Sequence, residues 1–225
     1  MNVTAVLGGV ACGLALSLAN AQAGIFTYTD NIPLTVEGGY PPSTSTLDLS
    51  NYGLGNILSS GDNVSMTLNI SGISGGGYNG NLVVYLNYEV TKTVHLISNP
   101  GFPGPYYVGY TDPGYNVTLS DGNYQNINNQ GSYNFPSSQL TGTYNPLDGN
   151  VAFQTYNGLS PNGHWVLTID NELGGTSFTL NSWSLTLDTV PEPVNVALGV
   201  FGLLFATILM VSRRADSPLM KKQPA

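Results

Sequence analysis

The chain has 225 residues with thirteen acidic and five basic side chains, a net formal charge of −8. The region 24–189, between two terminal apolar segments, carries eleven acids and one base, a formal charge of −10. This acidity excludes nucleic acid as a partner, because the phosphate backbone would be repelled. The single cysteine, Cys12, lies outside this region, which excludes an internal disulfide there. A region of this length suits one domain around one core.

The N-terminal segment has the pattern of a secretory signal. Residues 3–18 are mostly apolar and are followed by Ala21-Gln22-Ala23. A signal peptidase recognises such an A-x-A site through two pockets for small side chains. We therefore predict a signal peptide over 1–23, cleaved after Ala23, and passage of the chain through the export machinery.

The C-terminal segment has the pattern of a membrane-spanning helix. Residues 194–211 are apolar apart from one amide and one hydroxyl, and eighteen helical residues span about 27 Å, close to the thickness of a bilayer core. Four of the five basic residues follow this run, as the positive-inside rule expects of a cytoplasmic flank. The pattern predicts a transmembrane helix over 194–212 and a basic cytoplasmic tail over 213–225. A plain membrane anchor with a proline-stiffened stem is one interpretation.

A second interpretation comes from the order of three features, a Val-Pro-Glu-Pro stretch, an apolar helix and an arginine pair. Together they resemble the PEP-CTERM sorting signal of exported proteins in exopolysaccharide-forming Gram-negative bacteria. The resemblance implies that an exosortase, a membrane transpeptidase-like enzyme, recognises residues 190–193, cuts near them and releases or re-attaches the exported region. The residues that carry this resemblance are Val190, Pro191, Glu192, Pro193, Arg213 and Arg214.

Between the two ends, alternation of apolar and polar residues predicts β-strands. Turn signals rich in glycine, asparagine and aspartate separate these runs. The pattern indicates an all-β, antiparallel β-sandwich or jelly roll over 24–189. The runs that alternate are 43–49, 64–70, 82–88, 93–97, 151–156 and 165–169.

The last strand region contains a change of phase. Phe178 and Leu180 are even-numbered, whereas Trp183, Leu185 and Leu187 are odd-numbered. A strand with a period of two cannot keep both sets on one face. We predict a bulge or tight turn at residues 181–182, with the final strand beginning at Trp183.

The same region resembles the end of a known domain. The stretch 162–187 combines Gly-x-Trp, an apolar strand, an Asp, a glycine turn and Leu-x-x-Trp-x-Leu. It is similar to the P domain that accompanies the catalytic domain of proprotein convertases and bacterial subtilisins. The stretch 78–101 resembles the central hairpin of that domain, and 31–36 its opening. The resemblance implies a galactose-binding-like jelly roll.

Enzyme chemistry is weakly represented in the sequence. There are two histidines, His95 and His164, and a catalytic triad would need one of them beside a nucleophile and an acid. A catalytic site needs several titratable groups that converge, and the region is poor in them. We predict no catalytic residues and no enzymatic activity.

Calcium is the one cofactor that the sequence suggests, and we otherwise expect none. Exported proteins meet calcium, which takes oxygen ligands from acids, amides and backbone carbonyls. The candidates are Asp170, Asn171 and Glu172, which follow a predicted strand. The alternative is a solvated turn whose aspartate caps the backbone.

Tyrosines concentrate in the middle of the chain, including the stretch 104–116. Tyrosine offers a flat ring and a hydroxyl, which suit sugar rings and protein partners. We therefore consider Tyr106, Tyr107 and Tyr110 as ligand-facing aromatics. The alternative is that these rings stabilise strands through cross-strand pairs.

Together these patterns predict an exported, non-enzymatic β-sandwich protein. It is held at the inner membrane, processed by an exosortase and delivered to the cell surface, outer membrane or exopolysaccharide matrix. Its expected partners are signal peptidase, the exosortase and, through the alternative of a carbohydrate-binding module, polysaccharide. A third hypothesis is an accessory domain of a secreted protease.

Overall fold

The computed structural model describes residues 24–57, 63–72, 77–104, 109–190 and 200–209. From Gln22 to Val190 the chain is one compact unit built of β-strands. The strands are β1 (Gly24–Asp30), β2 (Leu34–Glu37), β3 (Ser43–Asp48), β4 (Asn56–Ile57), β5 (Val64–Gly72), β6 (Leu82–Tyr88), β7 (Lys92–Ser98), β8 (Gly114–Ser120), β9 (Leu140–Tyr144), β10 (His164–Asn171) and β11 (Ser177–Val190). Among the described residues, three short 3₁₀ helices join them, η1 (Asn79–Asn81), η3 (Ile127–Asn129) and η4 (Ala152–Tyr156).

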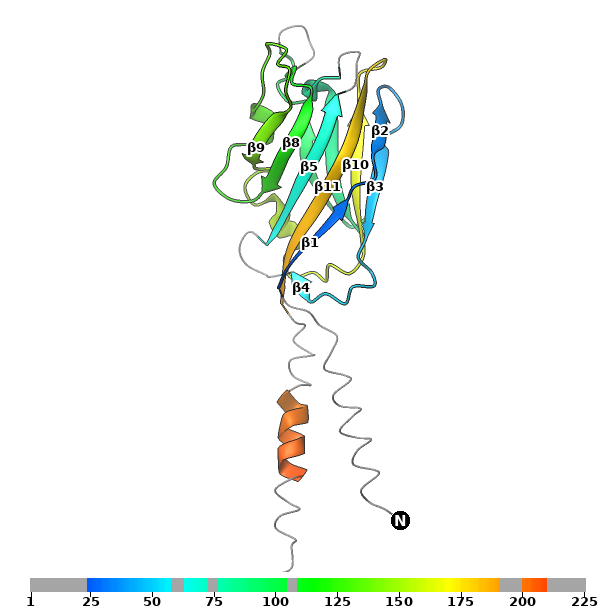
Figure 1. The fold of residues 1–225 in the computed structure, drawn as a ribbon. Coiled ribbons are helices and arrows are strands. Elements are labelled where there is room, and N and C mark those ends of the chain that lie inside the picture. The colour runs from blue at the N-terminus through cyan, green and yellow to red at the C-terminus, as the bar shows by residue number, and fades with distance from the viewer. Residues whose placement is uncertain (1–23, 58–62, 73–76, 105–108, 191–199, 210–225) are drawn as a thin grey trace, which may run out of the picture. The chain divides into compact units, whose positions relative to one another are not determined.

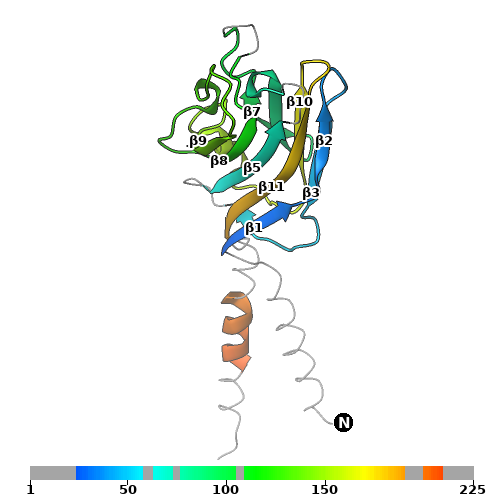
Figure 2. The ribbon, with the colours of Figure 1, turned by 45° about the horizontal axis from the view of Figure 1, so that its top comes forward.

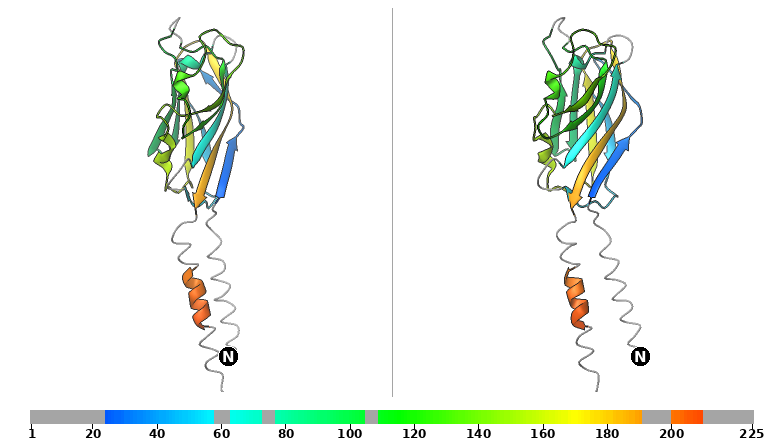
Figure 3. Two further views of the ribbon diagram at one scale, coloured as in Figure 1. Left: turned by 90° about the vertical axis from the view of Figure 1, so that its left-hand side faces the viewer. Right: turned by 60° about the vertical axis from the view of Figure 1, so that its left-hand side comes forward.

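The strands form two sheets that pack face to face. One sheet has seven strands in the order β1-β11-β5-β8-β9, with β2 and β4 also paired to β11, and the other has the order β3-β10-β6-β7. In Figure 1 and Figure 2 the seven-stranded sheet faces the viewer, and Figure 3 shows the two layers from the side. The predicted β-sandwich is confirmed.

The predicted alternation places the core correctly. Val64, Met66, Leu68 and Ile70 of β5 are all buried, because successive strand residues point to opposite faces of the sheet. The predicted inward residues of β6 and β10 are buried in the same way: Leu82, Val84, Leu86, Trp165, Leu167 and Ile169. The two inner faces together form the hydrophobic core.

Both tryptophans lie in this core with their indole N–H groups satisfied. Trp183 of β11 donates to Ser45 Oγ of β3 at 2.7 Å, and Ser45 in turn donates to the Asp30 carboxylate. Trp165 donates to the Pro161 carbonyl at 3.0 Å. A buried donor without a partner would cost about 1–3 kcal/mol. The Trp183 hydrogen bond therefore links the two sheets, whereas the Trp165 bond holds its ring to the loop before β10.

The phase change in β11 is a β-bulge, as predicted. The register against β5 shifts between Leu180 and Ser182, so that Phe178 and Trp183 both face the core. The prediction that the final strand begins at Trp183 is wrong, because β11 runs without a break from Ser177. The bulge absorbs one residue without ending the strand.

Two further expectations are corrected. Residues 151–156 were expected to form a strand but contain η4, because the Asp121 carboxylate accepts hydrogen bonds from the backbone N–H groups of Phe153 and Gln154. The expectation of purely antiparallel sheets is also wrong, since β9 pairs with β8 in parallel. A long connection, 121–139, joins these strands, and parallel pairing requires such a crossover.

The C-terminal unit contains a described helix over 200–209. It falls within the predicted span 194–212, whose other residues lie outside the described part of the chain. Within the described residues, none of the helices has both the length and the apolar character needed to cross a membrane. The transmembrane helix stays a prediction.

Candidate functional site

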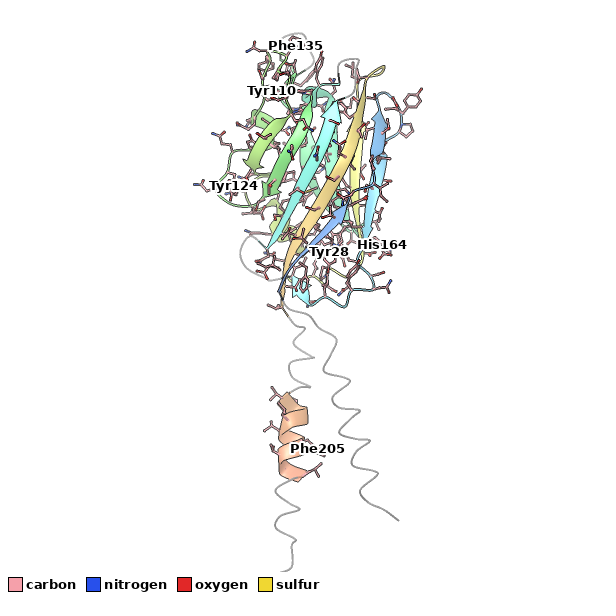
Figure 4. All side chains as sticks on the ribbon, viewed as in Figure 1. Tyr28, Tyr110, Tyr124, Phe135, His164 and Phe205 are labelled. Atoms are coloured by element: carbon pink, nitrogen blue, oxygen red, sulfur yellow. The ribbon has the colours of Figure 1, made fainter. Side chains whose placement is uncertain are left out.

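An open groove lies among the loops that join β7, β8 and β9. Its volume is about 590 Å³, within the range of small-molecule sites. Tyr110, labelled in Figure 4, marks its place at the upper end of the sandwich in that view. None of the described residues that line the groove is charged. They are Ser98, Asn99, Gly101, Phe102, Pro103, Tyr110, Asn126, Asn128, Asn129, Tyr133 and Leu147.

Two tyrosine rings form one wall of the groove. The rings of Tyr110 and Tyr133 have centroids 4.7 Å apart and planes inclined by 44°. Tyr133 Oη donates to the Gly101 carbonyl at 2.9 Å. Burial, followed by the neighbouring Tyr133, raises the pKa of Tyr110, so its hydroxyl stays protonated at neutral pH. The pair is therefore an uncharged wall with little freedom to move.

Glycine allows the backbone to approach this wall. Gly101 has φ +74°, and a Cβ on it would lie 2.8 Å from Cγ of Tyr110. Gly131 meets the same ring from another segment, with 2.6 Å between its ideal Cβ and Tyr110 Cγ. Any side chain at either position would displace the ring.

A buried carboxylate fixes the segment that carries Tyr133. Asp112, which is 6% exposed, accepts a hydrogen bond from the Ser132 N–H at 2.7 Å. Thr111 donates through both its N–H and its hydroxyl to the Ser132 carbonyl, and its hydroxyl accepts from the Phe135 N–H. Burial raises the pKa of the Asp112 carboxyl, although the Ser132 N–H opposes this. The loop that carries Tyr133 is thus held by several hydrogen bonds against the segment that precedes β8.

Asparagine amides build the opposite side. Asn128 acts as a backbone mimic, accepting from the Ser98 N–H and donating to the Ser98 carbonyl. Asn126 caps η3 by accepting from the Asn128 N–H and donates to the Pro146 and Leu147 carbonyls. These amides are occupied in holding the loop, whereas Asn129 is exposed on η3. The Phe102 ring is 57% exposed.

The structure brings one predicted aromatic to the groove. Tyr110 lines it, whereas Tyr106 and Tyr107 lie outside the described residues. Sequence reasoning missed Phe102, Tyr133 and Asn129. Phe102 lies in the same glycine-, proline- and aromatic-rich run as Tyr110, so the composition of this run could have identified it. Tyr133 and Asn129 follow some twenty residues later and join the site only through the fold.

The calcium candidates Asp170, Asn171 and Glu172 lie at the end of β10 and the start of the turn before β11. Asn171 is buried and holds that turn, donating to the Thr176 carbonyl at 3.1 Å. Glu172 accepts from the Asn99 amide at 2.8 Å. Burial, then the like charge of Glu172, raises the pKa of Asp170. In the described part of the chain no three His, Cys, Asp or Glu side chains are grouped to hold a metal. Calcium binding here stays a prediction.

The predicted processing residues lie almost wholly outside the described residues. Ala21 and Ala23 of the signal site, Pro191, Glu192 and Pro193 of the sorting motif, and the pair Arg213 and Arg214 are among them. Val190 is the exception, as the last residue of β11. The motif therefore begins where the final strand ends.

No family model and no curated protein matches the chain. Among solved structures, the chain is similar to the serine protease of Aeromonas sobria, with 14% identity and a TM-score of 0.39 over 74% of this chain and 27% of that one. It is also similar to a complex of that protease with the chaperone, with 15% identity and a TM-score of 0.40 over 72% and 26%. The chain spans about a quarter of the length of these structures. Similarity at this level leaves the function to be argued from the site.

The raised pKa of Asp112 predicts how stability depends on pH. A carboxyl whose pKa is higher in the folded than in the unfolded state adds most to the free energy of unfolding below its unfolded pKa of about 3.9. This stabilisation is lost as the pH rises through the folded pKa. Asp112→Asn keeps an acceptor for the Ser132 N–H but removes the charge. We expect the variant to be more stable at pH 7 by roughly 1 kcal/mol and to match the parent below about pH 4.

Urea unfolding of the full chain, followed by fluorescence of the buried Trp165 and Trp183 at both pH values, measures this difference. Asp48→Asn is the control, and we expect it to be less stable than the parent at pH 7. Hydrogen bonds from the Ser50 hydroxyl and N–H lower the pKa of Asp48 and so favour its charged form. A less stable Asp112→Asn variant at pH 7 would contradict the account of Asp112.

Proposed function

We propose that the chain is an exported, non-enzymatic β-sandwich protein that binds neutral carbohydrate in the groove beside Tyr110. The observation that carries this proposal is the lining, which combines aromatic rings and amides and has no charged side chain. A sugar presents C–H groups that pack on an aromatic ring and hydroxyls that bond to amides. Within the groove, the exposed Phe102 ring and Asn129 amide suit these two roles.

The rigidity of the groove supports binding over catalysis. Tyr133, Asn126 and Asn128 use their polar atoms to hold the loops, so that little ordering is required when a ligand arrives. A preformed site loses less conformational entropy on binding than a mobile one. General acid–base catalysis most often uses a histidine or a carboxylate facing the ligand, and the described lining residues include neither.

The surroundings of His164 also support a non-enzymatic role. This residue has a carboxylate near each ring nitrogen, Glu89 Oε1 at 3.2 Å from Nδ1 and Asp48 Oδ2 at 3.7 Å from Nε2. A general base in a catalytic triad instead directs one nitrogen toward a nucleophile. His95 pairs with Asp148 through Nδ1 at 3.1 Å and does not line the groove.

An accessory domain of a secreted protease is the second candidate function. It is favoured by the P-domain-like stretch 162–187, which spans β10, the following turn and most of β11. In this proposal the sandwich is a galactose-binding-like jelly roll that serves a separate catalytic chain. Stable association with a subtilisin of the same host, measured by co-purification, is its test.

The groove proposal predicts a specific loss of binding. Phe102→Ala removes an exposed ring without opening the core, so we expect at least tenfold weaker binding of a neutral oligosaccharide identified on a glycan array. Titration calorimetry on the full chain in mild detergent measures it. Tyr40→Ala is the matched control, because Tyr40 is 69% exposed and does not line the groove. Equal losses in both variants, or no binding by the parent chain, would reject the groove as a carbohydrate site.

We further propose that the tail directs sorting. Residues 190–193 begin at the last residue of β11, at the boundary of the compact unit. Cleavage there would separate the sandwich from the predicted helix and basic tail. The exported sandwich would then reach the cell surface or matrix.

Mass spectrometry of the mature protein from its host tests both processing steps. We expect a chain that begins at Gly24 and ends near Pro193, with any attached group seen as added mass. When the host exosortase is deleted, the protein should be heavier by the mass of the C-terminal tail. An unchanged mass and location after that deletion would refute the sorting proposal.

A further inference from the structure

The outer face of the seven-stranded sheet carries rows of hydroxyl and amide side chains. This is the face turned toward the viewer in Figure 1. Residues in register across the sheet lie side by side on one face. The central row crosses five strands and is made entirely of hydroxyl residues: Thr29, Ser184, Thr67, Thr118 and Thr143.

Two more rows flank this one. The first contains four hydroxyl residues, Thr27, Thr186, Ser65 and Ser120. The second mixes hydroxyls and amides, Ser182, Asn69, Asn116 and Thr141. Strands lie about 4.8 Å apart, so the five-strand row spans roughly 20 Å. The face is therefore long enough to contact a stretch of polymer.

Hydrogen bonds between strands hold several of these side chains in place. The hydroxyls of Thr27 and Thr186 lie 2.9 Å apart, and those of Thr67 and Ser184 lie 2.6 Å apart. Asn69 Oδ1 accepts from the amide of Asn181 at 3.0 Å. Ser184 is only 6% exposed and supports Thr67 from below, whereas Thr27 and Thr67 are exposed. A hydroxyl has one donor and two acceptor sites, so the exposed threonine of each pair keeps capacity for an incoming hydroxyl.

The charged residues of this face lie outside the three rows. They include Asp188 of β11, one position beyond the Thr186 row, and Glu37 of β2. The outer positions of the opposite sheet carry Asp48, His164, Asp170 and His95, all at least partly exposed. The three rows therefore form an uncharged strip within an otherwise charged surface.

We infer that this face docks chains of a neutral, polyhydroxylated polymer, which is a polysaccharide without charged groups. The formal charge of −10 over 24–189 repels anionic polymers, and the rows offer no carboxylate to a cationic one. Paired hydroxyls that both donate and accept match the hydroxyls of a neutral sugar chain. The rows share no residue with the groove, so the two proposed binding sites can be tested independently.

Replacing threonine by valine removes the hydroxyl but keeps a β-branched side chain suited to a strand. The test variant combines Thr67→Val, Thr118→Val and Thr143→Val in the central row. The matched control combines Thr44→Val, Thr46→Val and Thr168→Val on the outer face of the four-stranded sheet. Fluorescence of the two buried tryptophans confirms that both variants fold.

The full chain in mild detergent is incubated with beads of cellulose, curdlan or cross-linked dextran, and with cross-linked alginate as an anionic polymer. We expect retention on at least one neutral polymer, unchanged in high salt because no ion pairs are involved, and none on alginate. The central-row variant should lose at least fivefold of this retention, whereas the control variant and Phe102→Ala keep it.

Three results would overturn the inference. The first is no retention on any neutral polymer, and the second is equal loss in the control variant. The third is loss in Phe102→Ala alone, which would assign the polymer to the groove and leave the proposed function standing. A change in sedimentation of the central-row variant without polymer would instead identify the face as a contact between two copies of the chain.

Discussion

The structure depends on the way β11 keeps a single inner face along fourteen residues. Without the bulge between Leu180 and Ser182, either Phe178 or Trp183 would point into solvent. Burying one large aromatic side chain contributes up to about 3 kcal/mol, so the bulge is strongly favoured. Because β11 pairs with β5 and β4 on one side and with β1 and β2 on the other, its register sets the register of most of the larger sheet.

This scaffold gives the loop-end groove its shape. The segment before β8 carries Tyr110 and Asp112, and hydrogen bonds to Ser132 draw the distant loop with Tyr133 against it. The amides of Asn126 and Asn128 hold the loops and are not free to bind a ligand. The result is a neutral, preformed cavity in an acidic protein, and this combination favours uncharged, hydroxyl-rich ligands over ionic ones.

Alternation in the sequence predicted most of the core and even the bulge, because a period of two is a local property of strands. It failed at 151–156, where the apolar spacing fits a strand but capping by Asp121, thirty residues away, favours a 3₁₀ helix. The parallel pairing of β9 was equally hidden, since it depends on a long crossover. Tyr110 was identified from composition, but Tyr133 reaches it only through contacts between distant segments.

The most direct test of the central claim is amide chemical-shift mapping of the isotope-labelled full chain in detergent during titration with a neutral oligosaccharide. Binding in the groove predicts saturable shifts in the amides of 98–102 and 126–133, which line or support the cavity. Amides at the opposite end of the sandwich, such as those of Tyr28 and Tyr52, should not move. Shifts that are absent, or that cluster away from these two segments, would contradict the account.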